Sequence, residues 1–156
     1  MRNTKSQEEM TPEEVLEICR KCGARCCRYV SYEMDEPENK RDFDDFRWFV
    51  MHKNVNIYYD TDGDWVLEFL TPCENLTADL KCKIHENRPM MCRGHDVNEC
   101  EEHGEGELAI VRFDKPEDVD KFIKEKGIKF DNDGNIINPE VLKMVEKNDD
   151  NKTFTK

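Results

Sequence analysis

The chain has 156 residues, enough for one domain with at most a small appendage. Hydrophobic residues make up 37% and charged residues 38%, so the apolar core must be modest and would benefit from metals or disulfides as staples. The net charge of −12 excludes a sequence-independent grip on nucleic acid, which requires a basic face. No apolar run approaches the roughly 20 residues that span a bilayer, and no secretory leader is recognisable, so we expect a cytoplasmic protein.

The first element that we expect is a helix from Thr11 to about Gly23. Thr11 can cap this helix, Pro12 suits its first position, and Glu14 completes a capping box. The stretch CRKCGARCC, residues 19–27, therefore begins on the last helical turn and continues into a loop.

Short helices and strands alternate along the rest of the chain. In order we expect a loop over 31–40, a helix over 41–53, a hairpin around 61–63, a strand within 107–113, a helix from Pro116, a second hairpin over 128–137 and a short helix from Asn138. The predicted fold is α+β, a small metal-stapled domain of short helices and β-hairpins around a cysteine cluster. We divide the chain into a metal-binding domain over 11–105, an accessory region over 106–148 packed on it, and frayed tails at 1–10 and 149–156.

Two acidic segments resemble calcium loops, DTDGDWVLEF from Asp60 and DNDGNIINPE from Asp131. An EF-hand loop needs glycine at its sixth position, whereas Gly63 and Gly134 occupy the fourth. We therefore interpret both segments as hairpin turns.

The eight cysteines are the chemical signal of the sequence. In a reducing compartment they indicate metal ligands rather than disulfides or redox thiols, although buried structural cysteines remain an alternative. Their spacing matches neither a paired-knuckle zinc finger nor a bacterial ferredoxin run. We expect as metal ligands Cys19, Cys22, Cys26, Cys27, Cys73, Cys82, Cys92 and Cys100.

The doubled cysteine, Cys26–Cys27, bears on the number of metal sites. Neighbouring side chains in an extended segment point in different directions, so two adjacent thiols tend to serve two ions, or one ion and the core. Eight thiols suffice for two four-coordinate ions or for one four-cysteine cluster with extra groups. The sequence leaves these alternatives open.

Three histidines follow cysteines at the same interval: His85, His95 and His103. Imidazole suits zinc and iron, so each is a possible substitute ligand. Their polar, loop-rich surroundings are equally typical of exposed histidine, and both interpretations stay open.

At this point the motifs CRKCGARCC, TPCENL, CKIHENRPMMCR and NECE resemble the YkgJ-type cysteine-cluster proteins, a zinc- or iron-chelating domain called the CxxCxxCC family. The most specific part is CKIHENRPMMCR, residues 82–93, which reproduces the family's C-x-I-Y-x-x-R-P-x-x-C-R pattern in spacing. The resemblance covers about residues 15–103 and carries nothing over beyond them. It departs at His85, where the family usually has an aromatic residue, and this leaves the coordination number open.

Arg88 and Arg93 are expected to assist the bound group. Each is a cation close to several thiolates, where it lowers the net charge and can donate N–H groups to sulfur. Ordinary surface arginine is the alternative for both.

The function that we expect is an iron–sulfur cluster held for electron transfer or for the support of a partner enzyme. The resemblance implies that such domains work beside modifying enzymes, for example in flagellin lysine methylation. The alternative is a structural or metal-handling module holding one or two Zn²⁺. The sequence contains no H-E-x-x-H, no G-x-S-x-G and no phosphate-binding glycine loop, so we lean towards a protein without catalytic activity of its own.

Overall fold

The computed structural model describes residues 9–100 and 109–145. In these ranges the chain forms two compact units that interleave along the sequence, one of residues 9–31 and 69–100 and one of residues 32–68 and 109–145. We call the first the cysteine unit, because it holds all eight cysteines, and the second the sheet unit. Residues 32–68 therefore group with the C-terminal part of the chain. The division at residue 105 stays a prediction, and most of both expected tails lies outside the described residues.

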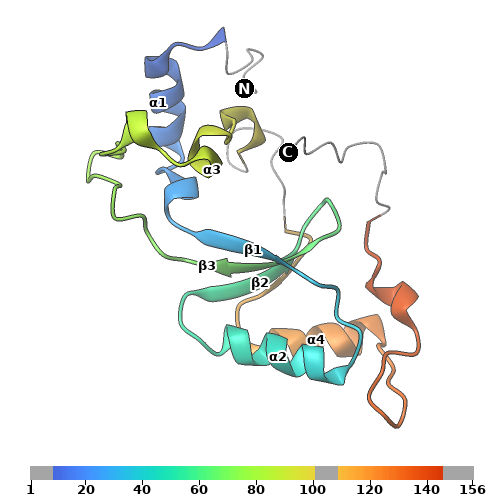
Figure 1. Ribbon diagram of the computed structural model, residues 1–156. Helices are drawn as coiled ribbons and strands as arrows, with labels where there is room; N and C mark the ends of the chain where they lie inside the picture. The colour runs from blue at the N-terminus through green and yellow to red at the C-terminus, as the bar shows by residue number, and fades with distance from the viewer. Residues whose placement is uncertain (1–8, 101–108, 146–156) are drawn as a thin grey trace. The chain divides into compact units, whose positions relative to one another are not determined.

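Four strands form one sheet in the order β1 (Val30–Met34), β3 (Trp65–Phe69), β2 (Val55–Tyr59) and β4 (Val111–Phe113). Figure 1 labels β1, β3 and β2. The turn at Gly63, where φ is 82°, joins β2 to β3. Strand β4 pairs antiparallel with β2, with Ile57 opposite Phe113.

Two amphipathic helices, α2 (Lys40–Val50) and α4 (Pro116–Lys126), lie side by side against one face of this sheet (Figure 1). Asn39 caps α2 by accepting from backbone N–H groups of its first turn. Pro116 opens α4, and Gly127 ends it at a φ of 63°.

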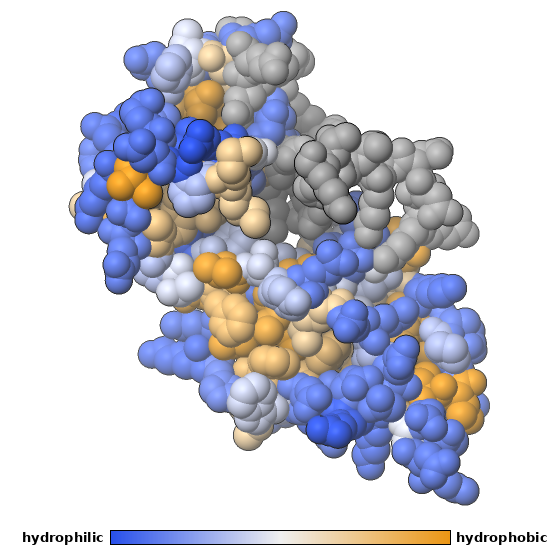
Figure 2. All heavy atoms as spheres, viewed as in Figure 1, coloured by the Kyte–Doolittle hydropathy of each residue, from blue (hydrophilic) through white to orange (hydrophobic). Residues whose placement is uncertain are grey.

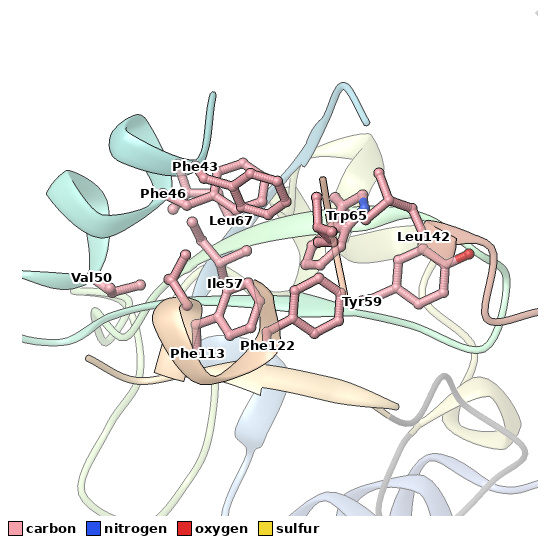
Figure 3. Packing of buried hydrophobic residues seen from close by; sticks show 12 residues of the cluster. Phe43, Phe46, Val50, Ile57, Tyr59, Trp65, Leu67, Phe113, Phe122 and Leu142 are labelled. Carbon is pink, nitrogen blue, oxygen red and sulfur yellow. The ribbon is translucent and has the colours of Figure 1, made fainter. Parts of the chain in front are cut away.

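The hydrophobic core of the sheet unit is dominated by aromatic rings. Trp65 of β3 stacks on Phe113 of β4 with ring centroids 5.6 Å apart, and Phe122 of α4 packs edge-on against both (Figure 3). The buried cluster comprises Phe43, Phe46, Val50, Ile57, Tyr59, Trp65, Leu67, Phe113, Val119, Phe122, Ile128 and Leu142. None of the eight cysteines belongs to this cluster, so the sheet unit has an apolar core of its own.

The cysteine unit is built from short pieces. It contains α1 (Pro12–Lys21), the 3₁₀ turns Arg25–Cys27, His85–Asn87 and Val97–Glu99, and the four-residue helix α3 (Met90–Arg93). Its buried apolar side chains, within the described residues, are Met10, Ala24 and Val97. A unit with so little apolar burial needs another source of stability.

The predicted α+β class is confirmed, and the helices expected from Thr11, near residue 41 and from Pro116 are all present. The loop expected over 31–40 is wrong in part, because Val30–Met34 forms β1. Val30, Tyr32 and Met34 alternate with polar residues, which is a strand pattern that the acidic stretch following it obscures.

The elements expected towards the C-terminus are present but shorter than predicted. The strand expected within 107–113 is Val111–Phe113, and the second hairpin retains a single bridge between Phe130 and Ile136. The short helix from Asn138 is a 3₁₀ turn over Pro139–Leu142. No helix within the described residues is long and apolar enough to cross a membrane.

Both calcium-like segments are turns stabilised by their own aspartates. Asp60 Oδ1 accepts from the backbone N–H groups of Asp62 and Asp64, and Asp131 does the same for Asp133 and Asn135. These bonds confirm the turn interpretation.

Candidate metal centre

Helix α1 presents the first two cysteines. Thr11 and Glu14 form a reciprocal capping box, with Thr11 N–H donating to Glu14 Oε2 at 2.7 Å. Cys19 lies in the last turn, and Cys22 is the C-cap residue, whose thiol lies 3.3 Å from the Cys19 carbonyl oxygen. The negative end of the helix dipole disfavours thiolates here, so a cation is the natural partner of this end.

The chain reverses direction at Gly23 and Ala24. Both residues are left-handed, with φ of 70° and 53°, and the Ala24 N–H donates to the Cys19 carbonyl at 2.8 Å. A left-handed alanine costs about 1–2 kcal/mol. The reversal leads directly into the 3₁₀ turn that holds Cys26 and Cys27.

A backbone hydrogen bond joins the first cysteine segment to the second. The N–H of Cys73 donates to the carbonyl oxygen of Cys27 at 2.7 Å. Leu76 then pairs with Cys82 in an isolated bridge, and a turn closed by Thr77 connects them. These contacts bring Cys27, Cys73 and Cys82 into one part of the unit.

Two arginines that are tethered to backbone carbonyls flank Cys92, and Cys100 follows them. Arg88 Nε donates to the His85 carbonyl at 2.9 Å, and Arg93 Nε donates to the Arg88 carbonyl at 2.7 Å. Pro89 precedes α3, which carries Cys92. Cys100 caps the 3₁₀ turn Val97–Glu99, and this turn packs against α1.

The cysteine thiols affect one another electrostatically. Desolvation raises the pKa of Cys19, and the charges of Cys22, Cys100 and Cys27 raise it further. The last contribution comes from Arg88, whose cation lowers that pKa.

The two adjacent thiols have different neighbours. Desolvation raises the pKa of Cys26 to about 12, with further contributions from Cys27, Cys19 and Cys22. Desolvation also raises the pKa of Cys27; the hydrogen bond with Cys26 opposes this rise, while the charges of Cys73, Cys82 and Cys92 add to it. Electrostatic interactions with Cys19, Cys26 and Cys27 thus involve all eight cysteines.

The donor set fits a soft metal. All eight cysteines are free, and the side chains of Cys26, Cys73 and Cys92 reach the surface. Within the described residues no three histidine, cysteine or acidic side chains converge to metal-holding geometry. The thiols therefore share one unit without being drawn together, and they lie on turns and loops that permit small movements. Cysteine thiolates suit zinc, iron and iron–sulfur clusters.

The structure does not define the roles of the two arginines and three histidines that the sequence singled out. The charge of Arg88 lowers the pKa of the Cys19 thiol, whereas Arg93 donates a hydrogen bond to the Arg88 carbonyl. His85 is exposed beside Glu86, with 3.4 Å between Nδ1 and Oε1, and His95 is half-buried. His103 lies outside the described residues. The roles of all five side chains stay predictions.

Sequence reasoning missed two residues that shape this site. Arg28 Nε donates to the Gly23 carbonyl at 2.6 Å and so braces the reversal, and Ala24 takes the left-handed conformation beside Gly23. The Gly23 signal was visible, but an alanine in that conformation has no sequence signature.

A separate hollow of about 740 Å³ lies in the sheet unit between the start of α2 and the 131–135 turn. It is open, and neither cysteine nor histidine lines it. It offers no soft ligand, and the cysteine unit remains the candidate centre.

Eight free thiols in a unit with little apolar core define a class: a cysteine-rich, metal-chelating domain. The chain belongs to the CxxCxxCC family, described as a "Putative zinc- or iron-chelating domain", whose model matches residues 18–125. The match extends through β4 and most of α4, so the resemblance does not stop at residue 103 as expected. No curated protein and no solved structure shows significant similarity to the chain.

Proposed function

We propose that this zinc- or iron-chelating domain holds an iron–sulfur cluster in the cysteine unit and uses it for electron transfer or for the support of a partner enzyme. The ligands are drawn from the eight cysteines, and Arg88 and Arg93 moderate the negative charge of the bound group. When bound, the cluster supplies one-electron redox chemistry.

The observation that carries this proposal is the segregation of all eight thiols in the unit that lacks an apolar core. The sheet unit has its own aromatic core and needs no staple. A metal group bound by the cysteine unit supplies folding free energy there, about 10 kcal/mol or more for structural zinc sites.

Surface exposure favours electron exchange. The side chains of Cys26, Cys73 and Cys92 are exposed, and the neighbouring Met90 and Met91 are 77% and 87% exposed. A cluster bound by these cysteines lies close to solvent, within reach of a redox partner. A donor set drawn from cysteine thiolates also favours an iron–sulfur cluster over a site with mixed cysteine and histidine ligands.

The second candidate is a structural or metal-handling module that holds one or two Zn²⁺. The same small core favours it, because zinc alone can fold such a unit. This version has no redox activity and no colour.

A protein partner suits either version. We place the chain in the cytoplasm, where free thiols persist, and expect a redox or modifying enzyme to dock on it. The net charge of −12 favours a basic protein surface over nucleic acid. Binding that did not weaken with added salt would count against this docking mode.

The test that separates iron–sulfur from zinc is elemental and sulfide analysis of protein purified without oxygen. The proposal expects iron, an equal amount of acid-labile sulfide, and a broad absorption band at about 400 nm that bleaches with dithionite. Colourless protein with one or two zincs per chain would select the module without redox activity. Folded protein with neither metal would overturn both.

A further inference from the structure

We infer that the outer edge of strand β1 pairs with an extended, basic segment of a partner protein, which adds to the sheet as a further strand. Acidic residues on β1 and directly after it meet the lysine or arginine side chains of that segment; they are Glu33, Asp35, Glu36 and Glu38. The inference deepens the protein docking proposed above and rests on it, but it does not depend on which metal the cysteine unit holds.

Strand β1 lies at an open edge of the sheet. It stands at one end of the strand order, so β3 is its neighbour on one side, and four of its five residues are exposed, whereas β2 and β3 are mostly buried. Within residues 9–100 and 109–145, no backbone hydrogen bond outside the sheet ties Val30–Met34 to another segment. Such an edge presents a row of N–H and C=O groups with which another strand can pair.

Strand β1 lacks most of the features that protect edge strands from pairing. Proteins keep such strands short or place lysine, proline or a bulge in them. The opposite edge, β4, has three residues, whereas β1 has five and contains no lysine, proline or glycine. It also exposes an aromatic residue, since Tyr32 is 71% exposed. Figure 2 shows hydrophobic residues at the surface in the region where Figure 1 draws the strands.

The alternation of side chains along β1 specifies the sequence pattern of the partner segment. Successive side chains point to opposite faces of a sheet, so Tyr32 and Met34 share one face and Glu33 lies on the other. Met34 packs against the apolar core cluster, which places the first face on the side that the helices cover. A pairing segment therefore needs a β-branched or aromatic residue beside Tyr32 and a lysine or arginine beside Glu33.

The chain continues from β1 into further carboxylates on a well-held backbone. The three acidic residues that follow β1 are exposed, and within the described residues no carboxylate of 33–38 forms an ion pair. The Glu38 carbonyl accepts from the Ile136 N–H at 2.9 Å, and the Glu38 N–H donates to Asp42 Oδ2 at 2.7 Å. These bonds fix the acidic segment directly after the open edge, where its charge favours a basic partner.

The same charge disfavours a second copy of this chain as the occupant of the edge. Each copy carries a net charge of −12, and pairing of two β1 strands would bring Glu33 and the acidic segment of one copy close to those of the other. A basic segment makes the same backbone hydrogen bonds and gains opposite-charge pairs instead of like-charge ones.

Peptide binding to the metal-bound protein, as purified, tests the inference. The probe is a short fluorescent peptide in which lysine alternates with valine, and fluorescence anisotropy measures its Kd. In one control peptide proline replaces alternate valines without changing the charge, and in another glutamate replaces every lysine. Both controls should bind at least about tenfold more weakly, because proline interrupts strand pairing and glutamate is repelled.

Variants of β1 locate the binding site of the peptide. Tyr32→Lys and Glu33→Lys each place a cation at the edge and should weaken binding about tenfold. Met51→Lys and Glu140→Lys make the same changes at exposed positions elsewhere in the sheet unit and should leave the Kd within about twofold of wild type. Near-ultraviolet circular dichroism of the aromatic core verifies that each variant is folded.

Every other outcome overturns the inference. Equal binding of the proline-containing peptide would show attraction to negative charge without strand pairing, and unchanged binding by both β1 variants would place the peptide elsewhere. Absence of peptide binding would exclude the site, and a dimer in sedimentation that Tyr32→Lys dissociates would assign the edge to a second copy.

Metal analysis of the same samples separates this test from that of the proposed function. Lost peptide binding with full metal content would refute the edge pairing alone. Folded protein without metal would refute the proposed function, while the peptide result would still report on β1, because the sheet unit has its own core.

Discussion

The backbone N–H of Cys73 donates to the carbonyl oxygen of Cys27 at 2.7 Å. This bond joins two cysteine segments that are separated in sequence by the first part of the sheet unit. It holds the two segments together without using a thiol. Backbone pairing therefore offsets part of the entropy cost of closing that long loop.

Replacing Cys82 or Cys92 by serine is expected to lower bound metal by half or more. A serine hydroxyl is a poor ligand for zinc and iron, so the affected site loses one of its four donors. Metal per chain, measured by elemental analysis, checks this. Met91→Ser is the matched control, because Met91 adjoins Cys92 and is exposed, and it should keep its full metal content. Full metal in either cysteine variant would remove that residue from the ligand set.

Weakening the start of α1 should weaken metal binding at its other end. Thr11→Ala removes a capping-box partner and costs about 1 kcal/mol of helix stability. Because the helix must form to present Cys19 and Cys22, Zn²⁺ affinity should fall about fivefold in competition with a chelator. Glu17→Gln, exposed on the same helix, should leave affinity unchanged. Equal affinities in the two variants would show that α1 is not needed to present the thiols.

Metal binding should release protons from the cysteine thiols. Zinc and iron bind the thiolate, so Zn²⁺ affinity should rise with pH. Calorimetric titration with Zn²⁺ in buffers of different ionisation enthalpy counts the protons. Affinity independent of pH would contradict thiolate ligation.

An ion pair to a buried carboxylate joins the two parts of the sheet unit, which lie in sequence before and after the segment that carries the last four cysteines. Arg112 Nη2 donates to Glu68 Oε2 at 3.0 Å, and Asn56 Nδ2 donates to the same oxygen at 3.2 Å. Glu68 ends the part of the sheet unit that precedes Cys73, and its side chain is 1% exposed. The chain thus leaves and re-enters the sheet unit beside one carboxylate.

Arg112→Met should destabilise the sheet unit by about 2–4 kcal/mol, because it removes the guanidinium that faces a buried carboxylate. The value is set below that of a fully buried pair, since the Arg112 side chain is 34% exposed. Urea unfolding followed by tryptophan emission measures it, since Trp48 and the buried Trp65 both lie in the sheet unit. Arg41→Met, on exposed α2 surface, should change stability by less than about 0.5 kcal/mol. A similarly small change for Arg112→Met would contradict the pair's role.

Local signals predicted most of the elements. The capping box at Thr11, the hairpin turn at Gly63 and the proline at 116 each act over a few residues, and all appear as expected. Strand β1 was missed because an edge strand of five residues followed by acidic loop gives a weak pattern.

Local sequence patterns could not predict that the two units interleave along the chain. Residues 32–68 pack with α4 and β4 through long-range contacts between aromatic side chains such as Phe43 and Phe122, and no motif in either segment indicates that the two pack together. The candidate metal ligands could be proposed from cysteine content and spacing alone. The 3₁₀ turn that holds Cys26 and Cys27, and the backbone bond between Cys27 and Cys73, could not be predicted from the sequence.

A pair of amide NMR spectra tests whether bound metal builds the cysteine unit, one of the purified metal-bound protein and one after removal of the metal by a chelator under reducing conditions. Resonances of residues 9–31 and 69–100 should collapse on metal removal, because this unit has little apolar core. Resonances of residues 32–68 and 109–145 should remain dispersed, because their aromatic core contains no cysteine. A cysteine unit that stayed dispersed without metal would contradict the claim that bound metal builds it.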